Sequence, residues 1–224
     1  MNIDNYTIKD SMIESLSKIL ESLKESPEKT LSEFNHASTL LLHIDIVEGF
    51  LNHGALSSEK VQLILPHVLR YNEGLDQVQK VFILDDHPED AVEFKAYPPH
   101  CVRGTGENEL VNELVPFTKD AMVFRKNSTN LFHAKGFVDY LKAQENQLKQ
   151  VLILGDVTDI CVLQGALSLK TYFDEHQLDI PLYVILKGVE TFDLEATFHH
   201  GELMNLFSLY NMRQNGIQLI KDLI

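Results

Sequence analysis

The sequence predicts an α/β fold: a doubly wound, six-stranded, mostly parallel sheet with helices on both faces, preceded by a helical extension. The first observation is that short apolar runs, typical of buried strands, alternate with segments of helical periodicity. The second is that polar residues capable of chemistry directly follow several of these runs, as they do at the carboxyl ends of strands in such sheets. The third is length, since 224 residues with 44% hydrophobic content fit one globular α/β domain.

The predicted elements follow the chain in a regular order. The six strands are expected at 39–46, 80–84, 122–124, 151–154, 182–186 and 217–220. The helices between and around them are expected at 58–73, 137–143, 160–176 and 194–211. With the strand order 3-2-1-4-5-6, strands one and four flank the crevice where the order reverses, which is where ligands bind in this architecture.

The first 36 residues are interpreted as an extension to a domain formed by residues 37–224. Apolar residues recur with helical spacing between residues 8 and 24, and Ser26-Pro27-Glu28 ends the pattern. No chemistry is apparent in this segment. We expect its helix to pack on the main domain or on a second subunit, so a homo-oligomer is one possible state.

Composition excludes several classes of partner. The net charge of −14 argues against nucleic acid and anionic membranes. Two cysteines, Cys101 and Cys161, give no disulfide framework and fit a reducing compartment. The N-terminus lacks the pattern of a secretory signal, and no apolar run is long enough to span a membrane. We therefore expect a cytoplasmic protein.

Cys161 lies in the most informative stretch, VLILGDVTDICVLQGALSLKTYFDEH (151–176). The stretch is interpreted as a buried strand, a tight turn from Gly155 to Asp159 and a helix. A thiol at the start of that helix would feel the positive end of the helix dipole, which favours the nucleophilic thiolate. The alternative is a buried structural cysteine, and placement alone does not separate the two.

A second informative stretch follows the predicted strand 80–84. Asp85 and His87 are two residues apart at the strand end, so both side chains can point to one side. Glu93 and His100 would return from the following loop, which Pro98-Pro99 stiffens. Two histidines with two carboxylates form a ligand set for a divalent transition metal. The alternative is a solvated loop, since an Asp-x-His triplet is common without a metal.

Asp45 and Lys126 lie at two other predicted strand ends. Asp45 is therefore either a site carboxylate or a turn or helix-capping residue. Lys126 is by default a solvated surface lysine. Beside a thiolate and a carboxylate, it would instead be a fixed cation that stabilises the thiolate.

The combination of Asp45, Lys126 and Cys161 with the sequence around the cysteine resembles the isochorismatase-like cysteine hydrolases. Within that group it resembles the nicotinamidases. The resemblance covers about residues 38–224. It rests on HIDIVEGF (43–50), DDHPEDAVEF (85–94), YPPHCVRGTG (97–106), FRKN (124–127) and GDVTDICVLQGA (155–166). The Pro-Pro-His-Cys-Val and Thr-Asp-Ile-Cys-Val segments together make it specific.

The resemblance implies a role for each candidate residue. Cys161 would be the nucleophile, Asp45 the general base, and Lys126 the cation that holds the cluster together. The metal ligands would be Asp85, His87 and His100, with Glu93 as a fourth. The expected cofactor is one divalent transition metal, zinc first, with manganese or iron as alternatives.

The resemblance also implies a substrate pocket and an oxyanion hole. The hole would be formed by the backbone N–H groups of Val157 and Cys161, the first aimed by a cis peptide bond after Asp156. Phe50 and Tyr97 would sandwich the substrate ring, and Thr129 stands where a ring-packing tyrosine is expected.

The implied reaction is hydrolysis of nicotinamide to nicotinate and ammonia through a thioester, a step of NAD salvage. Three alternatives remain open. One is an amidase acting on another small amide, and another is an isochorismatase, which lacks the metal ligands. The third is a non-catalytic homologue that binds partners through the N-terminal helix.

Overall fold

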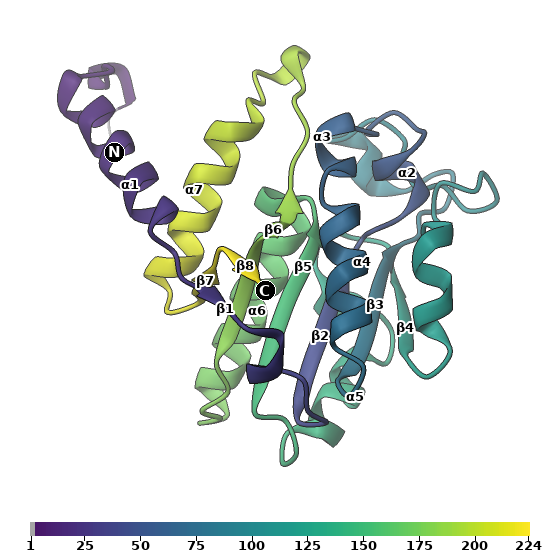
Figure 1. The fold of residues 1–224 in the computed structure, drawn as a ribbon. Coiled ribbons are helices and arrows are strands. Elements are labelled where there is room, and N and C mark those ends of the chain that lie inside the picture. Colours follow the sequence, from purple (N-terminus) through teal and green to yellow (C-terminus); the bar gives the residue numbers. More distant parts are fainter. Residues whose placement is uncertain (1–2) are drawn as a thin grey trace.

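The structure, a computed structural model, describes residues 3–224, and its centre is one parallel sheet (Figure 1). The strands lie in the order β4-β3-β2-β5-β6-β7, and every neighbouring pair is parallel. This confirms both the predicted fold class and the predicted order. The strands are β2 (Thr39–Ile44), β3 (Gln79–Asp85), β4 (Met122–Lys126), β5 (Gln150–Asp156), β6 (Leu182–Glu190) and β7 (Gln218–Ile220).

Helices cover both faces of this sheet because its central strands are apolar on both sides. All six residues of β2 are buried, as are the last five of β3 and the last six of β5. One face packs against α5 (Phe137–Gln144), α6 (Leu163–Glu175) and α7 (Gly201–Gln214). The other face packs against α3 (Glu59–Gln62), α4 (Leu65–Gly74) and the 3₁₀ segment η4 (Asn112–Thr118).

Several strands run further than predicted, and most of their added residues are polar. β3 ends at Asp85 and β4 at Lys126, and these two residues are register partners. β5 likewise continues to Asp156. The prediction followed apolar runs only, so it stopped where the strands pass from the core into the polar edge of the sheet. Asp85 and Lys126 are thereby held by the sheet itself.

Gly155 is required where β5 passes its register partner Ile44 on β2. It has a φ of 124°, and a Cβ atom there would lie 2.0 Å from the carbonyl oxygen of Ile44. Only glycine accommodates both the backbone conformation and the close approach. The chain can therefore turn out of β5 directly toward Cys161.

Two predicted helices differ in the structure. The helix expected at 58–73 is two helices, α3 and α4, with Pro66 in the first turn of α4, where its missing N–H costs no hydrogen bond. The helix expected from residue 194 begins at Gly201. Residues 191–200, here called the arm, leave the sheet instead and return through a hairpin closed by backbone bonds between Leu194 and His199. Phe198, at a φ of 56°, interrupts any helix there.

The N-terminal segment has an exposed outer part and an inner part joined to the body. Helix α1 (Asp10–Lys24) buries only Leu23, and Figure 1 shows it beside α7 at the edge of the molecule. Further along, β1 (Glu28–Lys29) pairs with β8 (Asp222–Leu223) in a two-stranded parallel sheet that the sequence did not predict. The domain boundary after residue 36 remains a prediction. Within residues 3–224, no helix combines the length and apolar character needed to span a membrane.

Candidate active site

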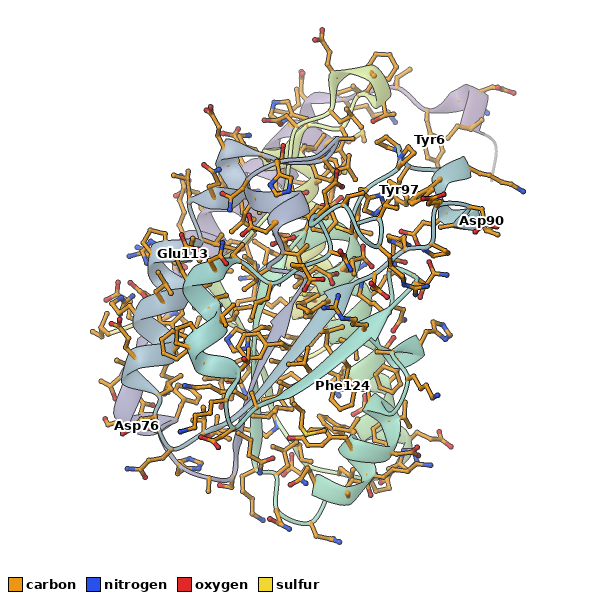
Figure 2. All side chains as sticks on the ribbon, turned by 90° about the vertical axis from the view of Figure 1, so that its right-hand side faces the viewer. Tyr6, Asp76, Asp90, Tyr97, Glu113 and Phe124 are labelled. Atoms are coloured by element: carbon orange, nitrogen blue, oxygen red, sulfur yellow. The ribbon has the colours of Figure 1, made fainter. Side chains whose placement is uncertain are left out.

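The predicted site residues meet at the carboxyl edge of the sheet. Asp45 follows β2, Asp85 ends β3 and Lys126 ends β4. Cys161 lies in η6 (Thr158–Val162), a π-helical turn that connects β5 to α6. Figure 2 shows Tyr97 and Asp90 toward this end of the molecule, with Asp76 at the opposite end.

Lys126 connects the two other residues expected to carry catalysis, Asp45 and Cys161, with the predicted metal ligand Asp85. Its Nζ lies 2.7 Å from Asp45 Oδ2, 2.7 Å from Asp85 Oδ1 and 3.6 Å from Cys161 Sγ. Burial disfavours a charged amine, but the charges of Asp45 and Asp85 outweigh it and hold the pKa of Lys126 well above its usual value. Lys126 is therefore a fixed cation inside the protein and not the solvated surface residue of the alternative interpretation.

Asp45 has an unusual backbone conformation and a perturbed carboxyl group. Its φ of 55° lies in the left-handed region, which non-glycine residues adopt mainly where the surroundings fix them. Burial raises the pKa of Asp45 to about 6, although Lys126 acts in the opposite direction. A carboxyl group with such a pKa can both take up and release a proton near neutral pH, as a general base must.

Burial of Cys161 opposes the thiolate form that its place at a helix start favours. Burial raises the pKa of the Cys161 thiol well above its ordinary value, and Lys126 opposes this shift only in part. Cys161 lies in the first turn of the π-helical segment, which continues directly into α6, so it stands at the start of a helix as predicted. The thiol therefore needs a base to remove its proton, and a carboxylate oxygen of Asp45 lies within 4.8 Å of its sulfur.

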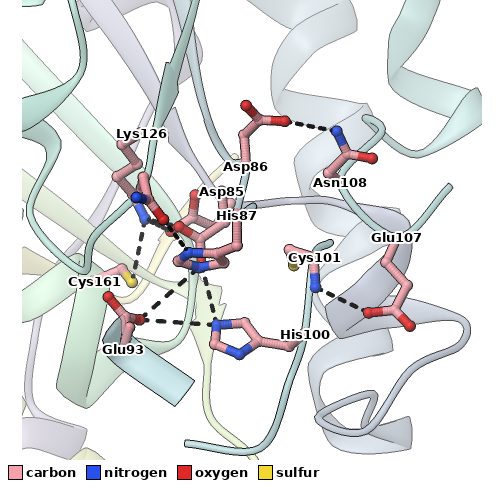
Figure 3. Close-up of polar contacts among 12 residues, drawn as sticks. Asp85, Asp86, His87, Glu93, His100, Cys101, Glu107, Asn108, Lys126 and Cys161 are labelled. Atoms are coloured by element: carbon pink, nitrogen blue, oxygen red, sulfur yellow. Dashed lines mark hydrogen bonds and ion pairs between the residues drawn. The ribbon is translucent and has the colours of Figure 1, made fainter. Parts of the chain in front are cut away.

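The four predicted metal ligands gather beside this cluster (Figure 3). Asp85 Oδ2 lies 3.1 Å from His87 Nε2 and 3.4 Å from His100 Nε2. Glu93 Oε1 lies 3.9 Å from both nitrogens. His87 Nε2 is fully buried and, despite its closeness to Asp85, makes no well-aligned hydrogen bond within residues 3–224, which suits a nitrogen whose lone pair binds a metal. The donor set therefore fits a transition metal.

Hydrogen bonds on the far side of each ring orient the two histidines. His87 Nδ1 lies 2.7 Å from Asn127 Oδ1, and His100 Nδ1 lies 2.8 Å from the carbonyl oxygen of Pro98. Both partners accept, so each neutral ring carries its proton on Nδ1 and presents the Nε2 lone pair to the carboxylates. Asn127 directly follows Lys126, yet its role was not predicted from the sequence.

A short parallel bridge brings the loop with His100 back to the end of β3. The His87 N–H donates to the carbonyl oxygen of Cys101, and the Arg103 N–H donates to that of His87. Cys101 is fully buried, and burial strongly raises the pKa of its thiol. Cys101 thus supports the loop, whereas Cys161 borders the pocket.

A narrow pocket lies between the catalytic cluster and the predicted metal ligands. All three predicted substrate-binding residues, Phe50, Tyr97 and Thr129, line it, and Thr129 also donates to Gln164 Oε1 at 2.9 Å. The peptide bond between Asp156 and Val157 is cis, as the resemblance implies. The remaining lining residues are Leu56, Asp85, Glu93, His100, Val157, Ile160, Cys161 and Phe192.

Three of the residues that line this pocket were not predicted from the sequence. Leu56 and Ile160 are aliphatic residues, and nothing in their local sequence distinguishes them from residues of the core. Phe192 belongs to the arm, which was not predicted to leave the sheet. The pocket is therefore an apolar slot with a thiol and metal-type ligands on its walls, suited to a small flat molecule with polar groups at its rim.

Comparison with known proteins decides the family. The model of the isochorismatase domain matches residues 39–215. The chain belongs to the isochorismatase family. It is therefore a hydrolase of the isochorismatase-like amidohydrolase type, with the α/β architecture described above.

Individual relatives are distant. Nicotinamidase 1 of Arabidopsis thaliana is 29% identical over 216 residues, covering 84% of this chain and 87% of the relative. The pyrazinamidase of Pyrococcus horikoshii, solved in complex with zinc, is 24% identical with a TM-score of 0.66, covering 82% of this chain and 99% of that one. N-carbamoylsarcosine amidase from Thermoplasma acidophilum is 19% identical with a TM-score of 0.65, covering 82% and 96%. At these identities the two solved structures establish the fold alone.

Proposed function

We propose that this protein is a metal-dependent nicotinamidase, which hydrolyses nicotinamide to nicotinate and ammonia through a thioester on Cys161. The observation that carries the proposal is the position of Lys126. Its buried ammonium group binds Asp45 and Asp85 and lies 3.6 Å from the Cys161 sulfur, so one cation joins a nucleophile, a base and a metal-ligand set at one pocket.

In the first step, Asp45 removes the proton of the Cys161 thiol and the sulfur attacks the carboxamide carbon. The carbon–oxygen double bond becomes a single bond, and the negative charge moves to the oxygen. The N–H groups of Val157 and Cys161 are the proposed donors to this oxyanion. In comparable hydrolases, one such donor contributes about 3–4 kcal/mol to the stability of the transition state.

In the second step, Asp45 returns its proton to the amide nitrogen, the carbon–nitrogen bond breaks and ammonia leaves. The product on the enzyme is a thioester of Cys161. Water then attacks this thioester, with Asp45 again as the base, and nicotinate and the thiol are released. Lys126 keeps its proton throughout and balances the negative charge that passes between sulfur and carboxylate.

Asp85, His87, Glu93 and His100 are the residues proposed to hold the metal. Their mixture of imidazole and carboxylate suits zinc first, with manganese or iron as alternatives. When bound, the ion supplies a Lewis acid at the rim of the pocket, to which a pyridine nitrogen can bind. Phe50 and Tyr97 then fix the plane of the ring, which directs the carboxamide toward Cys161.

Ammonia release from a panel of amides tests this proposal. Nicotinamide and pyrazinamide carry a ring nitrogen meta to the carboxamide and should be hydrolysed, whereas benzamide lacks that nitrogen and should react poorly. A site that leaves a polar partner unpaired often discriminates by several kcal/mol. Equal rates on benzamide and nicotinamide would show that the site does not read the ring nitrogen.

The second proposed function is an amidase for another small amide. Thr129 supports it, because the resemblance leads one to expect a ring-packing tyrosine at this position and the threonine instead binds Gln164. A non-aromatic amide and a bulkier amide added to the panel test it, and faster hydrolysis of either would favour it. The metal-ligand set argues against an isochorismatase, and the complete Asp45, Lys126 and Cys161 cluster argues against a non-catalytic homologue.

A further inference from the structure

The arm, residues 191–200, supplies one wall of the pocket. It connects β6 to α7, and Figure 1 shows it rising beyond the end of β6 before the chain returns into α7. Phe192 is 4% exposed and lines the pocket together with Ile160 and Cys161. The arm has no regular strand or α-helix of its own, so other contacts must fix the position of Phe192.

Asp159 provides two of these contacts from the turn that carries Cys161. Its Oδ1 accepts a hydrogen bond of 2.6 Å from the hydroxyl of Thr191. Its Oδ2 lies 2.8 Å from Nε2 of His199. The two partners sit on opposite limbs of the arm, on either side of its hairpin. One carboxylate therefore holds both limbs to the catalytic turn.

His199 completes the connection to Phe192. Its Nδ1 lies 3.0 Å from the carbonyl oxygen of Phe192, so both ring nitrogens face oxygen acceptors. The imidazole also packs against the phenyl ring, with the ring centroids 4.7 Å apart and the planes inclined by 33°. The side chains of His199 and Asp159 are only 15% and 10% exposed. Phe192 is thus held through both its backbone and its ring.

We propose that Asp159 and His199 are positioning residues that hold Phe192 as a wall of the substrate pocket beside Cys161. The proposal rests on the proposed function, because it takes this pocket to be the one that binds the amide. Neither residue belongs to the Asp45, Lys126 and Cys161 cluster. Their loss should therefore weaken binding of the ring more than it slows the chemical step.

Steady-state kinetics on nicotinamide test this separation. Asp159→Ala and His199→Ala should each raise KM about tenfold, as expected when one apolar wall of a pocket is lost. Their kcat should stay within about threefold of the parent, because the wall contributes equally to binding of the substrate and of the transition state. His200→Ala is the matched control, since this exposed neighbour on the same arm should leave both constants unchanged. A fall in kcat with an unchanged KM would overturn the proposal.

Two further variants distinguish positioning from general support of the fold. Asp159→Asn keeps an oxygen for His199 and gains an amide donor for the Thr191 hydroxyl, so it should restore a nearly normal KM. Asp159→Ala combined with Phe192→Ala should raise KM no more than Phe192→Ala alone, because Asp159 acts through Phe192. Additive effects would contradict the proposal. If Asp159→Ala does not fold, Thr191→Val removes one of its two bonds and should raise KM by about threefold.

Labelling of Cys161 tests the wall without any substrate. Mass spectrometry of the Cys161 peptide measures the rate at which each reagent alkylates the thiol. The quantity compared between variants is the alkylation rate with N-benzyl iodoacetamide divided by the rate with iodoacetamide. This ratio cancels the intrinsic reactivity of the thiol. It should rise in Asp159→Ala, His199→Ala and Phe192→Ala but not in His200→Ala. An unchanged ratio in all variants would overturn the inference. If these ratios rise in the variants but the protein hydrolyses no amide, the role of Phe192 as a pocket wall stands and the proposed function is rejected.

Discussion

At the scale of single residues, Asp85 links the two halves of the site. One of its oxygens binds Lys126 and the other faces the Nε2 atoms of His87 and His100. The sequence predicted Asp85 as a ligand from its spacing to His87. It did not predict the link to Lys126, because that contact depends on the register between β3 and β4. The proposed nucleophile cluster and the proposed metal ligands therefore share one carboxylate.

Asn127 should control how tightly the metal is held. Its side-chain oxygen accepts the Nδ1 proton of His87 and fixes the ring with Nε2 toward the other ligands. Asn127→Ala should lower the affinity for zinc by about 10- to 100-fold, the usual effect of losing such a partner. Asn112→Ala, on an exposed side chain, is the control. Competition against a chelating dye measures the affinity, and equal affinities in the two variants would contradict this role.

At the scale of elements, the sequence predicted what apolar patterning determines. The strands, their order and the two helical layers follow from buried runs and from the connection rules for parallel sheets. Two features have no such pattern. The paired strands β1 and β8 are two residues long each, and the arm depends on distant hydrogen bonds to Asp159. Their positions are set by tertiary contacts, so local sequence could not reveal them.

Gly155 should be the least replaceable residue of the β5 turn. Gly155→Ala introduces a Cβ that would meet the Ile44 carbonyl oxygen, so the free energy of unfolding should fall by at least about 3 kcal/mol. Gly104→Ala is the matched control, because Gly104 also has a positive φ but open space around it. It should cost only about 1–2 kcal/mol. Urea unfolding measures the loss of unfolding free energy in both variants. Similar losses would mean that the positive φ alone, and not the contact with Ile44, requires glycine at position 155.

At the scale of the whole molecule, Asp222 ties the end of the chain to the body. Arg70 Nη2 lies 2.5 Å from its carboxylate, and the Tyr71 hydroxyl and Lys187 Nζ each lie at 2.7 Å. Burial disfavours the charged form, but these hydrogen bonds outweigh it and hold the pKa of Asp222 well below its usual value. Because β8 pairs with β1, the same carboxylate also supports the N-terminal segment.

Stability should therefore depend on pH through Asp222. A carboxyl group whose pKa is lower in the folded state stabilises the fold above its unfolded pKa of about 4. That contribution is lost as the pH falls from there toward the lower folded pKa. Asp222→Asn should reduce the free energy of unfolding by about 1–3 kcal/mol at pH 7. The difference from the parent should shrink below about pH 4. A difference that stays constant from pH 7 to pH 3 would contradict this assignment.

The proposed mechanism requires that Cys161 forms a thioester with the acyl group of the substrate. Its most direct test is a rapid acid quench during the first turnover with nicotinamide, followed by peptide mass spectrometry. One nicotinoyl group should appear on Cys161 and none on Cys101, and Cys161→Ala should give neither adduct nor ammonia. Ammonia release by Cys161→Ala, or hydrolysis by the parent protein with the acyl group on another residue, would contradict it.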